Sequence, residues 1–457
     1  MSSPALPSLA ASSAEPSGAR RCPALFISAP GSGHGKTTVT AAIARLHREQ
    51  GRRVRVFKTG PDFLDPTVLE RASGHPVYQL DLWLAGAAHC RALVQQAAQE
   101  ADLILIEGVM GLYDGAPCSA DLAALLGMPV LLVINAAGVA QSMGALAHGL
   151  ASYRARPGLS FAGVLANGVG SERHAQMLQQ GMDSAHMPLL ACIPRQAQFS
   201  LPERHLGLVP AAEVADLDLR LSALAAQLQE TPLAQLPEVL SFDAMPPPAD
   251  AGRLLAGRSI AIARDAAFSF IYQANLDWLQ AQGAHLRFFS PLSDAAVPDA
   301  DAVYLPGGYP ELHLQALQDN RAMQAALRAH FEAGKHIYAE CGGMLYLLNS
   351  LTDKHGQTAE MCGLLPGTAE MQTRLQGLGY QSFSLPEAGQ EALRCHTFHY
   401  SRSSIALTPA ATGQRLFDTS AGEAVYRLRG LCASYLHAYF ASAPRTAAQL
   451  FGGVLPS

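Results

Sequence analysis

Residues 28–38 constrain the fold of this chain most strongly, because they join a predicted strand to a predicted helix through a glycine-rich turn. They read Ser-Ala-Pro-Gly-Ser-Gly-His-Gly-Lys-Thr-Thr, after the apolar run 25–28 and before an amphipathic segment that ends near Gly51. Glycines let backbone N–H groups surround phosphate oxygens, and a helix N-terminus adds partial positive charge. The order strand, loop, helix therefore predicts a phosphate-binding loop.

The letters of this loop match the variant form G-x-G-K-T-T. Pro30 stands where the strict pattern has its first glycine. In such a loop, Lys36 reaches the β and γ phosphates and Thr37 can bind Mg²⁺. A glycine-rich turn without ligand is the alternative, and the flanking strand and helix disfavour it. The predicted ATP-binding residues here are Gly33, Gly35, Lys36, Thr37 and Thr38.

The first half of the chain alternates short apolar runs with longer helical segments. Continuous Val/Ile/Leu runs separated by helices predict an α/β fold with a parallel sheet covered on both faces. The predicted strands are 25–28, 54–57, 103–106, 130–134 and 161–165, and a helix is expected over 217–236.

A second alternation follows the exposed Pro-Pro-Pro stretch at 246–248 and predicts a second α/β domain. Its expected strands are 259–263, 285–289, 302–305, 336–339 and 431–435. The two halves show no sequence repeat, which favours two different functions in one chain. We expect a disordered tail over 1–21, an ATP-dependent domain over 22–236, a linker over 237–256 and the second domain over 257–457.

Carboxylates follow two further strands of the first domain. Asp62 and Asp65 come after the second strand, and Glu107 and Asp114 after the third. Ligands of a parallel sheet gather at the carboxyl ends of its strands, so these side chains can converge on Mg²⁺ while Lys58 offsets phosphoryl charge. The alternative is that single carboxylates cap helices.

One cysteine of the second domain has the surroundings of a nucleophile. Cys341 follows a predicted strand and precedes Gly342 and Gly343, which allows a tight turn that exposes the sulfur and aims the next N–H at it. Gly308, after another strand, can give a second oxyanion-hole donor beside Gly342, and His437 can take the thiol proton. A lone cysteine is more often a packed residue, but the ordered trio favours catalysis.

Composition restricts the partners and the compartment. Lys and Arg number 32 against 37 Asp and Glu, with no long basic run and no stretch of about 18 apolar residues, so neither nucleic acid nor a membrane is expected. Eight cysteines without a C-x-x-C pair argue against zinc and disulfides and favour the cytoplasm. Small molecules are the expected partners.

Taken together, these blocks resemble the cobyrinic acid a,c-diamide synthase family, including its hydrogenobyrinic acid form. The likeness runs from about residue 24 to 442. Its marks are Gly-Lys-Thr-Thr, Gly-Pro-Asp-Phe-Leu-Asp-Pro, Glu-Gly-Val-Met-Gly-Leu-Tyr-Asp-Gly, Leu-Pro-Glu-Arg-His-Leu-Gly-Leu-Val (201–209), Leu-Pro-Gly-Gly-Tyr-Pro-Glu and Glu-Cys-Gly-Gly-Met. The resemblance implies a P-loop, dethiobiotin-synthetase-like domain followed by a class I glutamine amidotransferase domain.

The resemblance also implies roles for these residues. Cys341 would be the glutaminase nucleophile and His437 its activator, while Lys36 and Lys58 would serve phosphoryl transfer. Metal contacts would come from Thr37, Asp62 and Glu107, substrate contacts from Asp62, Asp65 and Asp114, and an adenine contact from Asn167. Mg²⁺ is the expected cofactor, with ATP and glutamine as co-substrates and a corrinoid polycarboxylate as partner.

The sequence departs from the pattern at two places. Tyr439 stands two residues after His437, where many class I amidotransferases have the glutamate of a triad, so the group that orients the histidine is not identified. Gly168 follows Asn167 where a basic residue is common. His396 and His399 face substrate or simply pack.

The implied reaction is an ATP-dependent ligation of glutamine-derived ammonia to the a and c acetates, through an acyl phosphate, in cobalamin biosynthesis. Phe63 and Leu64 are hypothesised to contact the corrin ring and to select the acetate. Alternatives are a cobyric acid synthase-like amidotransferase and a non-catalytic ATP-dependent switch. The cobalt content of the substrate, the order of amidation and a homodimeric state are left open.

Overall fold

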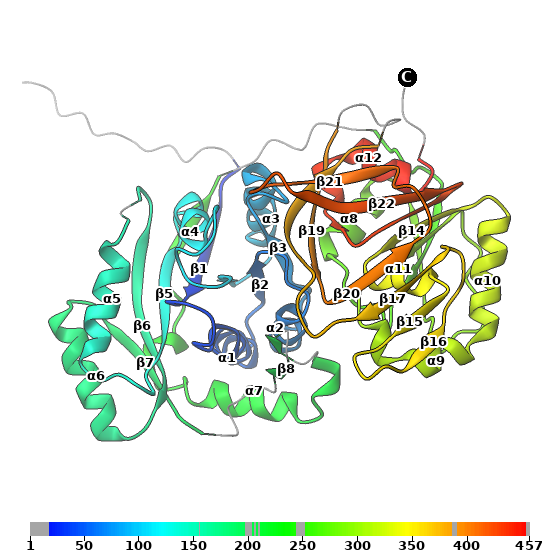
Figure 1. Cartoon of the computed structure of the whole chain (residues 1–457). Coiled ribbons are helices and arrows are strands. Elements are labelled where there is room, and N and C mark those ends of the chain that lie inside the picture. The colour runs from blue at the N-terminus through cyan, green and yellow to red at the C-terminus, as the bar shows by residue number, and fades with distance from the viewer. Residues whose placement is uncertain are drawn as a thin grey trace, which may run out of the picture.

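The computed structural model describes residues 18–154, 156–196, 203–204, 207–208, 211–243, 252–385 and 391–453. Two α/β units lie side by side, one from blue to green and the other from green to red (Figure 1). Of the block 201–209, only 203–204 and 207–208 lie within the described residues. No helix in the described part of the chain is long and apolar enough to cross a membrane.

The N-terminal unit is built on a sheet with the order β3-β2-β4-β1-β5-β6-β7. All of these strands pair in parallel, as predicted, and β10 adds to β1 in the antiparallel direction. The strands are β1 (Arg20–Ser28), β2 (Val54–Thr59), β3 (Tyr78–Leu80), β4 (Leu103–Glu107), β5 (Pro129–Asn135), β6 (Ser160–Val169), β7 (Leu189–Pro194) and β10 (Val239–Phe242).

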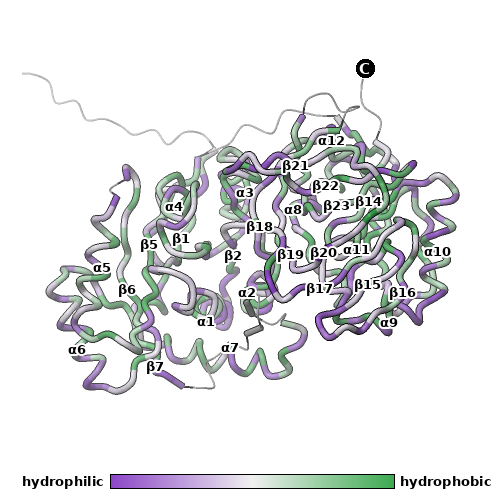
Figure 2. Tube along the Cα trace, in the orientation of Figure 1, coloured by the Kyte–Doolittle hydropathy of each residue, from purple (hydrophilic) through white to green (hydrophobic). Residues whose placement is uncertain are grey.

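Helices cover both faces of this sheet, because its central strands are apolar on both sides. Every residue of β4 is buried, and the apolar character of the strands is visible in Figure 2. One core lies under α1 and α7, and a second one lies on the opposite face. The helices are α1 (Lys36–Glu49), α2 (Asp65–Ser73), α3 (Ala87–Ala97), α4 (Ser119–Leu126), α5 (Ser142–Ser152), α6 (Glu172–Ser184) and α7 (Leu217–Ala226).

The helix predicted over 217–236 is wrong in length. The α-helix ends at Ala226, and a 3₁₀ helix, η3 (Pro232–Ala234), follows it. Thr231 is extended, with φ −104° and ψ 162°, because a residue before proline is forced out of the helical region. Beyond it, β10 lies within the predicted linker 237–256 and pairs with β1, so this part of the stretch belongs to the first sheet.

The C-terminal unit has a ten-stranded sheet in the order β12-β11-β13-β14-β23-β22-β21-β18-β19-β24. The strands from β12 to β23 are parallel, and the remainder pair as antiparallel neighbours that the sequence did not predict. They are β11 (Ser259–Ala263), β12 (His285–Phe289), β13 (Ala302–Leu305), β14 (His336–Glu340), β18 (Gly377–Phe383), β19 (Leu393–His399), β21 (Ala411–Arg415), β22 (Ala421–Leu428), β23 (Leu431–Ser434) and β24 (His437–Ala438).

Smaller elements complete the two units. A four-stranded sheet combines β15 (Ser350–Thr352), β16 (Thr358–Glu360), β17 (Gly367–Met371) and β20 (Ser401–Ile405), and β8 (Glu203–Arg204) pairs with β9 (Gly207–Leu208). The helices are α8 (Gln273–Ala281), α9 (Leu314–Asp319), α10 (Arg321–Glu332), α11 (Gly342–Leu347) and α12 (Pro444–Leu450), with 3₁₀ turns η2 (Ala211–Glu213), η4 (Pro310–Leu312) and η6 (Phe440–Ser442).

Polar and apolar contacts join the two units around β3 and α8. Tyr78 Oη donates to Asp277 at 2.6 Å, and Tyr380 Oη donates to Asp81 at 2.5 Å. A small buried cluster that includes Leu84 of the first unit and Tyr439 of the second lies beside these bonds. The two units therefore meet through matched side chains rather than through a bare linker.

The contact between α5 and α6 gives a stability test with a matched control. A Cβ atom at Gly144 would lie 2.0 Å from the carbonyl oxygen of Gly181, whereas a Cβ at Gly149 on the same helix meets nothing within 4 Å. We expect Gly144→Ala to destabilise the N-terminal unit by about 2 kcal/mol through overpacking. Gly149→Ala should instead stabilise it by roughly 0.5–1 kcal/mol, because alanine loses less entropy in a helix. Thermal unfolding midpoints measure both, and equal shifts would contradict the close packing.

Candidate active sites

The predicted phosphate loop has the backbone that such a loop requires. Gly33 and Gly35 take left-handed φ angles of +76° and +88°, which favour glycine, and α1 begins directly after them at Lys36. Lys36 Nζ donates to the carbonyl oxygen of Gly31 at 2.9 Å. Burial, and then the charge of Lys58, lower the pKa of Lys36 to about 8. A phosphate anion in the loop would offset the unfavourable burial of the Lys36 charge and its repulsion from Lys58. The charge and backbone of the loop therefore suit a phosphate group.

Asn167 lies against the back of the loop. Its Nδ2 donates to the carbonyl oxygen of His34 at 3.0 Å, and a Cβ at Gly35 would lie 2.2 Å from the same nitrogen. Any other residue at position 35 would therefore collide with Asn167 as well as strain the turn. The structure thus brings Asn167 to the nucleotide loop, and its contact with adenine stays a prediction.

Beside the loop, Lys58 lies at the centre of a buried charge cluster. Its Nζ is 2.6 Å from Asp65 Oδ2 and 2.6 Å from Glu107 Oε1, and 3.7 Å from Asp62 Oδ2. Thr37 Oγ1 lies 3.1 Å from Asp65 Oδ2 and 2.7 Å from Glu107 Oε1, so its one hydroxyl proton is shared between the same two carboxylates. Residues from β2, α2, β4 and the phosphate loop therefore meet at the carboxyl ends of the strands, as the sequence predicts.

The charges of this cluster depend on one another. Burial would lower the pKa of Lys58, but Asp65 and Glu107 together raise it well above its usual value. Burial raises the pKa of Asp65 while Lys58 and hydrogen bonds lower it, with a net decrease. Burial and the nearby Asp65 raise the pKa of Asp62 to about 7, and burial raises that of Glu107. Lys58 thus remains charged and holds the carboxylates together.

Two predicted members, Asp114 and Thr38, form no side-chain hydrogen bond or ion pair with this cluster among the described residues. Asp114 Oδ2 instead accepts a hydrogen bond from the N–H of Gly111 at 2.8 Å, which closes the turn that follows β4. Thr38 is the third residue of α1. Their predicted contacts with substrate and ATP remain predictions.

The oxygen atoms around Thr37 suit a magnesium ion that is shared with phosphates. In the described part of the chain, no group of three or more His, Cys, Asp or Glu side chains has the arrangement of a complete metal site. Magnesium in nucleotide enzymes is usually held by one or two protein oxygens together with phosphates and waters. Glu107 Oε2 is buried without a hydrogen-bond partner among the described residues, and Thr37 Oγ1 is next to its other oxygen. This donor set fits such an ion.

In the second unit, Cys341 occupies a strained turn between β14 and α11. Its φ is +43°, which is unusual for a residue with a side chain and costs on the order of 1–3 kcal/mol. Its N–H donates to the carbonyl oxygen of Ser434 at 2.8 Å, and its carbonyl accepts from Leu345 at 3.0 Å. The turn is therefore held from both sides.

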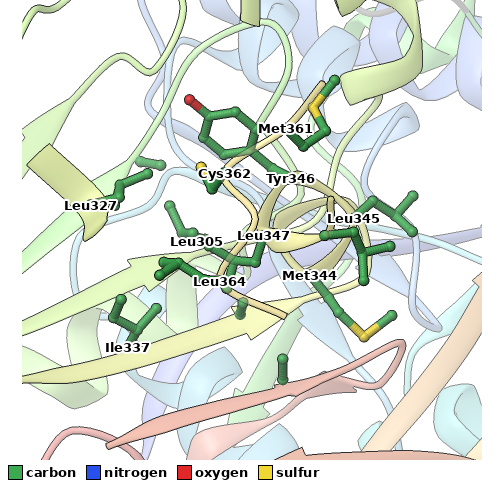
Figure 3. Close-up of a cluster of buried hydrophobic side chains, with 14 of the residues drawn as sticks. Leu305, Leu327, Ile337, Met344, Leu345, Tyr346, Leu347, Met361, Cys362 and Leu364 are labelled. Carbon is green, nitrogen blue, oxygen red and sulfur yellow. The ribbon is translucent and has the colours of Figure 1, made fainter. Parts of the chain in front are cut away.

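The glycines after Cys341 are required by close packing. A Cβ at Gly343 would lie 2.1 Å from the carbonyl oxygen of Leu305, and one at Gly342 would lie 2.9 Å from the nitrogen of Gly308. The apolar side chains of α11 then anchor the turn in the core, as Figure 3 shows for Met344 and its neighbours. The predicted strand-to-helix turn is present with the Gly308 backbone beside it, but the predicted exposure of the sulfur is wrong, because Cys341 is buried in the core around α11.

His437 reaches the same place from β24. A Cβ at Gly307 would lie 2.2 Å from the imidazole Cε1, so the Gly307-Gly308 turn passes directly along the histidine. Burial, and then His399, lower the pKa of His437 to about 3, so the ring is neutral in this state. Burial, with Glu311, raises the pKa of the Cys341 thiol. Within the described residues, no hydrogen bond joins the Cys341 sulfur to the His437 ring.

A histidine and a phenylalanine pack on His437. His396 stacks on it with ring centroids 4.9 Å apart, and the Tyr272 hydroxyl is 2.8 Å from His396 Nδ1. Phe63, from the loop of the other unit, lies 5.2 Å from His437 and is stacked 5.2 Å from Phe270. Sequence reasoning missed Phe270 and Tyr272, because no motif marks them, and it assigned Phe63 no contact with the histidine.

A cavity of about 380 Å³ lies between the two units. Asp62, Phe63 and Leu64 form one side of it, and His396 and His437 are on the other. His399 does not line it and instead contacts Ser401 and Glu423. Asp62 of the phosphate-site loop and His437 of the cysteine site therefore border one cavity, although Cys341, Lys36 and Lys58 do not line it.

Comparison with known proteins agrees with this two-unit organisation. Residues 25–209 match the CobQ/CobB/MinD/ParA nucleotide binding domain, and residues 259–445 match the CobB/CobQ-like glutamine amidotransferase domain. Hydrogenobyrinate a,c-diamide synthase from Pseudomonas aeruginosa is 57% identical, over 94% of this chain and 97% of its own.

Two further relatives show similar coverage. Hydrogenobyrinate a,c-diamide synthase from Stutzerimonas stutzeri is 57% identical over 94% of this chain and 99% of its own. Cobyrinate a,c-diamide synthase from Herminiimonas arsenicoxydans is 49% identical over 93% of this chain and 96% of its own. With both domains matched in order and nearly the full length aligned, this chain belongs to the cobyrinate and hydrogenobyrinate a,c-diamide synthase family.

Proposed function

We propose that this chain is a glutamine-dependent ligase that uses ATP to amidate the a and c acetate carboxylates of hydrogenobyrinic or cobyrinic acid. The names of its full-length relatives support this assignment. The observation that carries it is the shared cavity, with Asp62 of the phosphate-site loop on one side and His437 of the cysteine site on the other. A carboxylate placed in that cavity lies between a phosphoryl donor and an ammonia source.

The first unit activates the carboxylate. A carboxylate resists ammonia because its carbon is shielded by negative charge and oxide is a poor leaving group. Transfer of the γ-phosphoryl group of ATP to a carboxylate oxygen gives an acyl phosphate and ADP, and the acyl phosphate has phosphate as its leaving group. Lys36 binds the phosphates, and Lys58, charged and buried between Asp65 and Glu107, stabilises the charge on the transferred group.

Thr37 and Glu107 are the residues that would hold a magnesium ion here. Such an ion, when bound, neutralises phosphate charge and helps to orient the γ-phosphoryl group. Asp65, which also accepts from Thr37, keeps the threonine hydroxyl and Lys58 in place.

The second unit releases ammonia. The Cys341 proton moves to His437, the sulfur attacks the carboxamide carbon of glutamine, and the C–N bond breaks as ammonia leaves with that proton. Water then hydrolyses the thioester to glutamate. The N–H groups of Gly308 and Gly342 would stabilise the oxyanion, and the close approach of their backbones supports this role.

Ammonia would cross the cavity between the units. Free ammonia at neutral pH is mostly ammonium, which is not nucleophilic, so an apolar passage keeps it reactive. Phe63, Phe270 and Phe398 line the cavity, and the corrin ring would rest on part of this apolar surface. The loop that carries Asp62 and Asp65 also carries Phe63 and Leu64, so substrate activation and contact with the ring come from one segment.

The direct test is a product assay. We expect the protein, with ATP, Mg²⁺ and glutamine, to convert two carboxyl groups of hydrogenobyrinic or cobyrinic acid to amides. Mass spectrometry detects each step as the replacement of a carboxyl OH by NH₂. Side-by-side incubation of the two substrates decides which one is preferred. No mass change on either substrate would reject the assignment, and amidation at other side chains would indicate a cobyric acid synthase-like enzyme.

Replacement of Cys341 should separate glutamine hydrolysis in the second unit from carboxylate amidation in the first. Cys341→Ala should abolish glutamine-driven amidation yet retain amidation with high concentrations of ammonium salt, because only the ammonia source is lost. Cys192→Ala, a half-buried cysteine of β7, is the matched control and should retain both. Loss of the ammonia-driven reaction in Cys341→Ala, with normal folding, would contradict separate centres.

The position of Phe63 predicts that its removal uncouples the two centres. Phe63→Ala opens the cavity beside His437, so ammonia should escape and the glutamate released per amide formed should rise several-fold. The ratio of singly to doubly amidated corrin should also change, in Phe63→Ala and in Leu64→Ala, because both line the substrate side. Phe288→Ala, an exposed position on β12, serves as the control. Unchanged stoichiometry and product order would exclude these roles for the loop.

A further inference from the structure

The catalytic histidine of the second unit has one ring nitrogen without a visible partner. His437 Nδ1 is buried and makes no hydrogen bond with any described residue. Such a buried nitrogen is costly to leave unpaired, and in histidine-assisted nucleophiles this atom is the one that an acidic group orients. A partner for Nδ1 is therefore expected within the protein.

Tyr439 does not supply that partner. It stands two residues after His437, but its hydroxyl is itself buried without a hydrogen bond among the described residues. Its ring packs instead on Tyr272 and His89, with centroids 5.7 Å away in both cases. The position that holds a glutamate in many related amidotransferases is thus part of the interface between the units here.

Glu340 is the acidic group that faces His437. It is the last residue of β14, directly before the nucleophile Cys341, and its Oε2 lies 3.8 Å from His437 Nδ1. Both side chains are 2% exposed. A shift of about 1 Å would give an ordinary N–H···O hydrogen bond.

The other contacts of Glu340 leave one position open for this bond. Oε1 accepts from Tyr338 Oη at 2.9 Å and from the N–H of Ala438 at 3.0 Å. Oε2 accepts from Tyr304 Oη at 2.8 Å. A carboxylate accepts about four hydrogen bonds, so one site remains, on the oxygen nearest to His437. Because Ala438 follows His437, the carboxylate is also fixed to the strand that carries the histidine.

We propose that Glu340 is the positioning residue of the glutaminase site, and that its carboxylate orients His437 and stabilises the imidazolium after the Cys341 proton arrives. The role rests on the proposed function of the second unit. The Cys341 proton moves to Nε2 while the Nδ1 proton points to Glu340 and stays on the ring. Nucleophile and orienting group are then consecutive residues of one strand end, and the histidine is the third member.

The surroundings of Glu340 raise its pKa toward neutral pH, so its ionisation can be followed in a pH profile of the activity. Burial raises the pKa of Glu340 to about 7, although its three hydrogen bonds oppose this. No Lys or Arg of the described chain forms an ion pair with it. The titratable groups around Glu340 and His437 are Tyr272, Tyr304, Tyr338, Cys395, His396 and His399, besides Cys341 itself. Burial raises the pKa of each of these tyrosines and of Cys395 well above its usual value, and it lowers the pKa of His396 well below its usual value.

The test compares Glu340→Gln with Glu340→Asp in the full-length protein. Glutaminase kcat/KM, followed as glutamate release, should fall ~100-fold or more in Glu340→Gln, as expected when an orienting carboxylate is lost. The wild-type profile should decline below about pH 7 as Glu340 is protonated, and this limb should disappear in Glu340→Gln. Glu340→Asp should recover part of the rate and keep the limb. A merely structural role would not move the pH profile.

Tyr439→Phe is the matched control and should retain the wild-type glutaminase rate and pH profile. Ammonia-driven amidation reports on the first unit and on folding. If Glu340→Gln loses glutaminase activity but keeps ammonia-driven amidation, the proposal is supported. If neither reaction occurs in the wild-type protein, the proposed function fails instead. Wild-type kcat/KM in Glu340→Gln would overturn the role of Glu340. If Glu340→Gln does not fold, Glu340→Asp decides, and an unchanged rate and profile in that variant would also overturn it.

Discussion

The packing of Phe63 against the second unit is the interaction on which the two-site organisation depends. Phe63 lies between Asp62, which faces Lys58, and Leu64, and its ring contacts Phe270, Tyr272, His396 and His437 of the other unit. The loop that carries Phe63 also carries Asp62 and Asp65, so one segment contacts both Lys58 and His437. Burial of the aromatic ring contributes up to a few kcal/mol to the contact between the units. A structural change at one site can therefore affect the other site through the Phe63 side chain alone.

Each site also concentrates an unfavourable feature that the surrounding fold supports. In the first unit, buried Lys58 and Glu107 meet half-buried Asp65, which is tolerated because Lys58 pairs with both carboxylates. In the second unit, Cys341 takes a left-handed φ between two anchored elements. Charge in a dry site and strain at a nucleophile are features of catalytic centres, and here rigid strands on either side make both possible.

Much of the fold could be predicted from short-range patterns. The strands 259–263 and 302–305 begin and end where predicted, because buried parallel strands are continuous apolar runs. The strand 285–289 also has the predicted bounds, although it lies at the sheet edge and is mostly exposed. The helix over 217–236 was overextended, because Pro232 and the extended Thr231 outweigh the Ala/Leu composition. The antiparallel strands after residue 350 escaped prediction because apolar and polar residues alternate weakly along them, although β18–β19 and β21–β22 pair as neighbours in the chain.

The sequence alone determined the phosphate loop, the Cys-Gly-Gly turn, the order of the chemical groups and the family, because glycine spacing and strand-to-helix junctions are local properties. Only the tertiary structure decided that Lys58 joins Asp65 with Glu107, that Phe63 reaches His437, and that Glu340 rather than Tyr439 faces Nδ1. These contacts join residues that are up to about 370 positions apart in the chain, as Phe63 and His437 are. Their distances follow from sheet order and from the docking of two units, which no local pattern encodes.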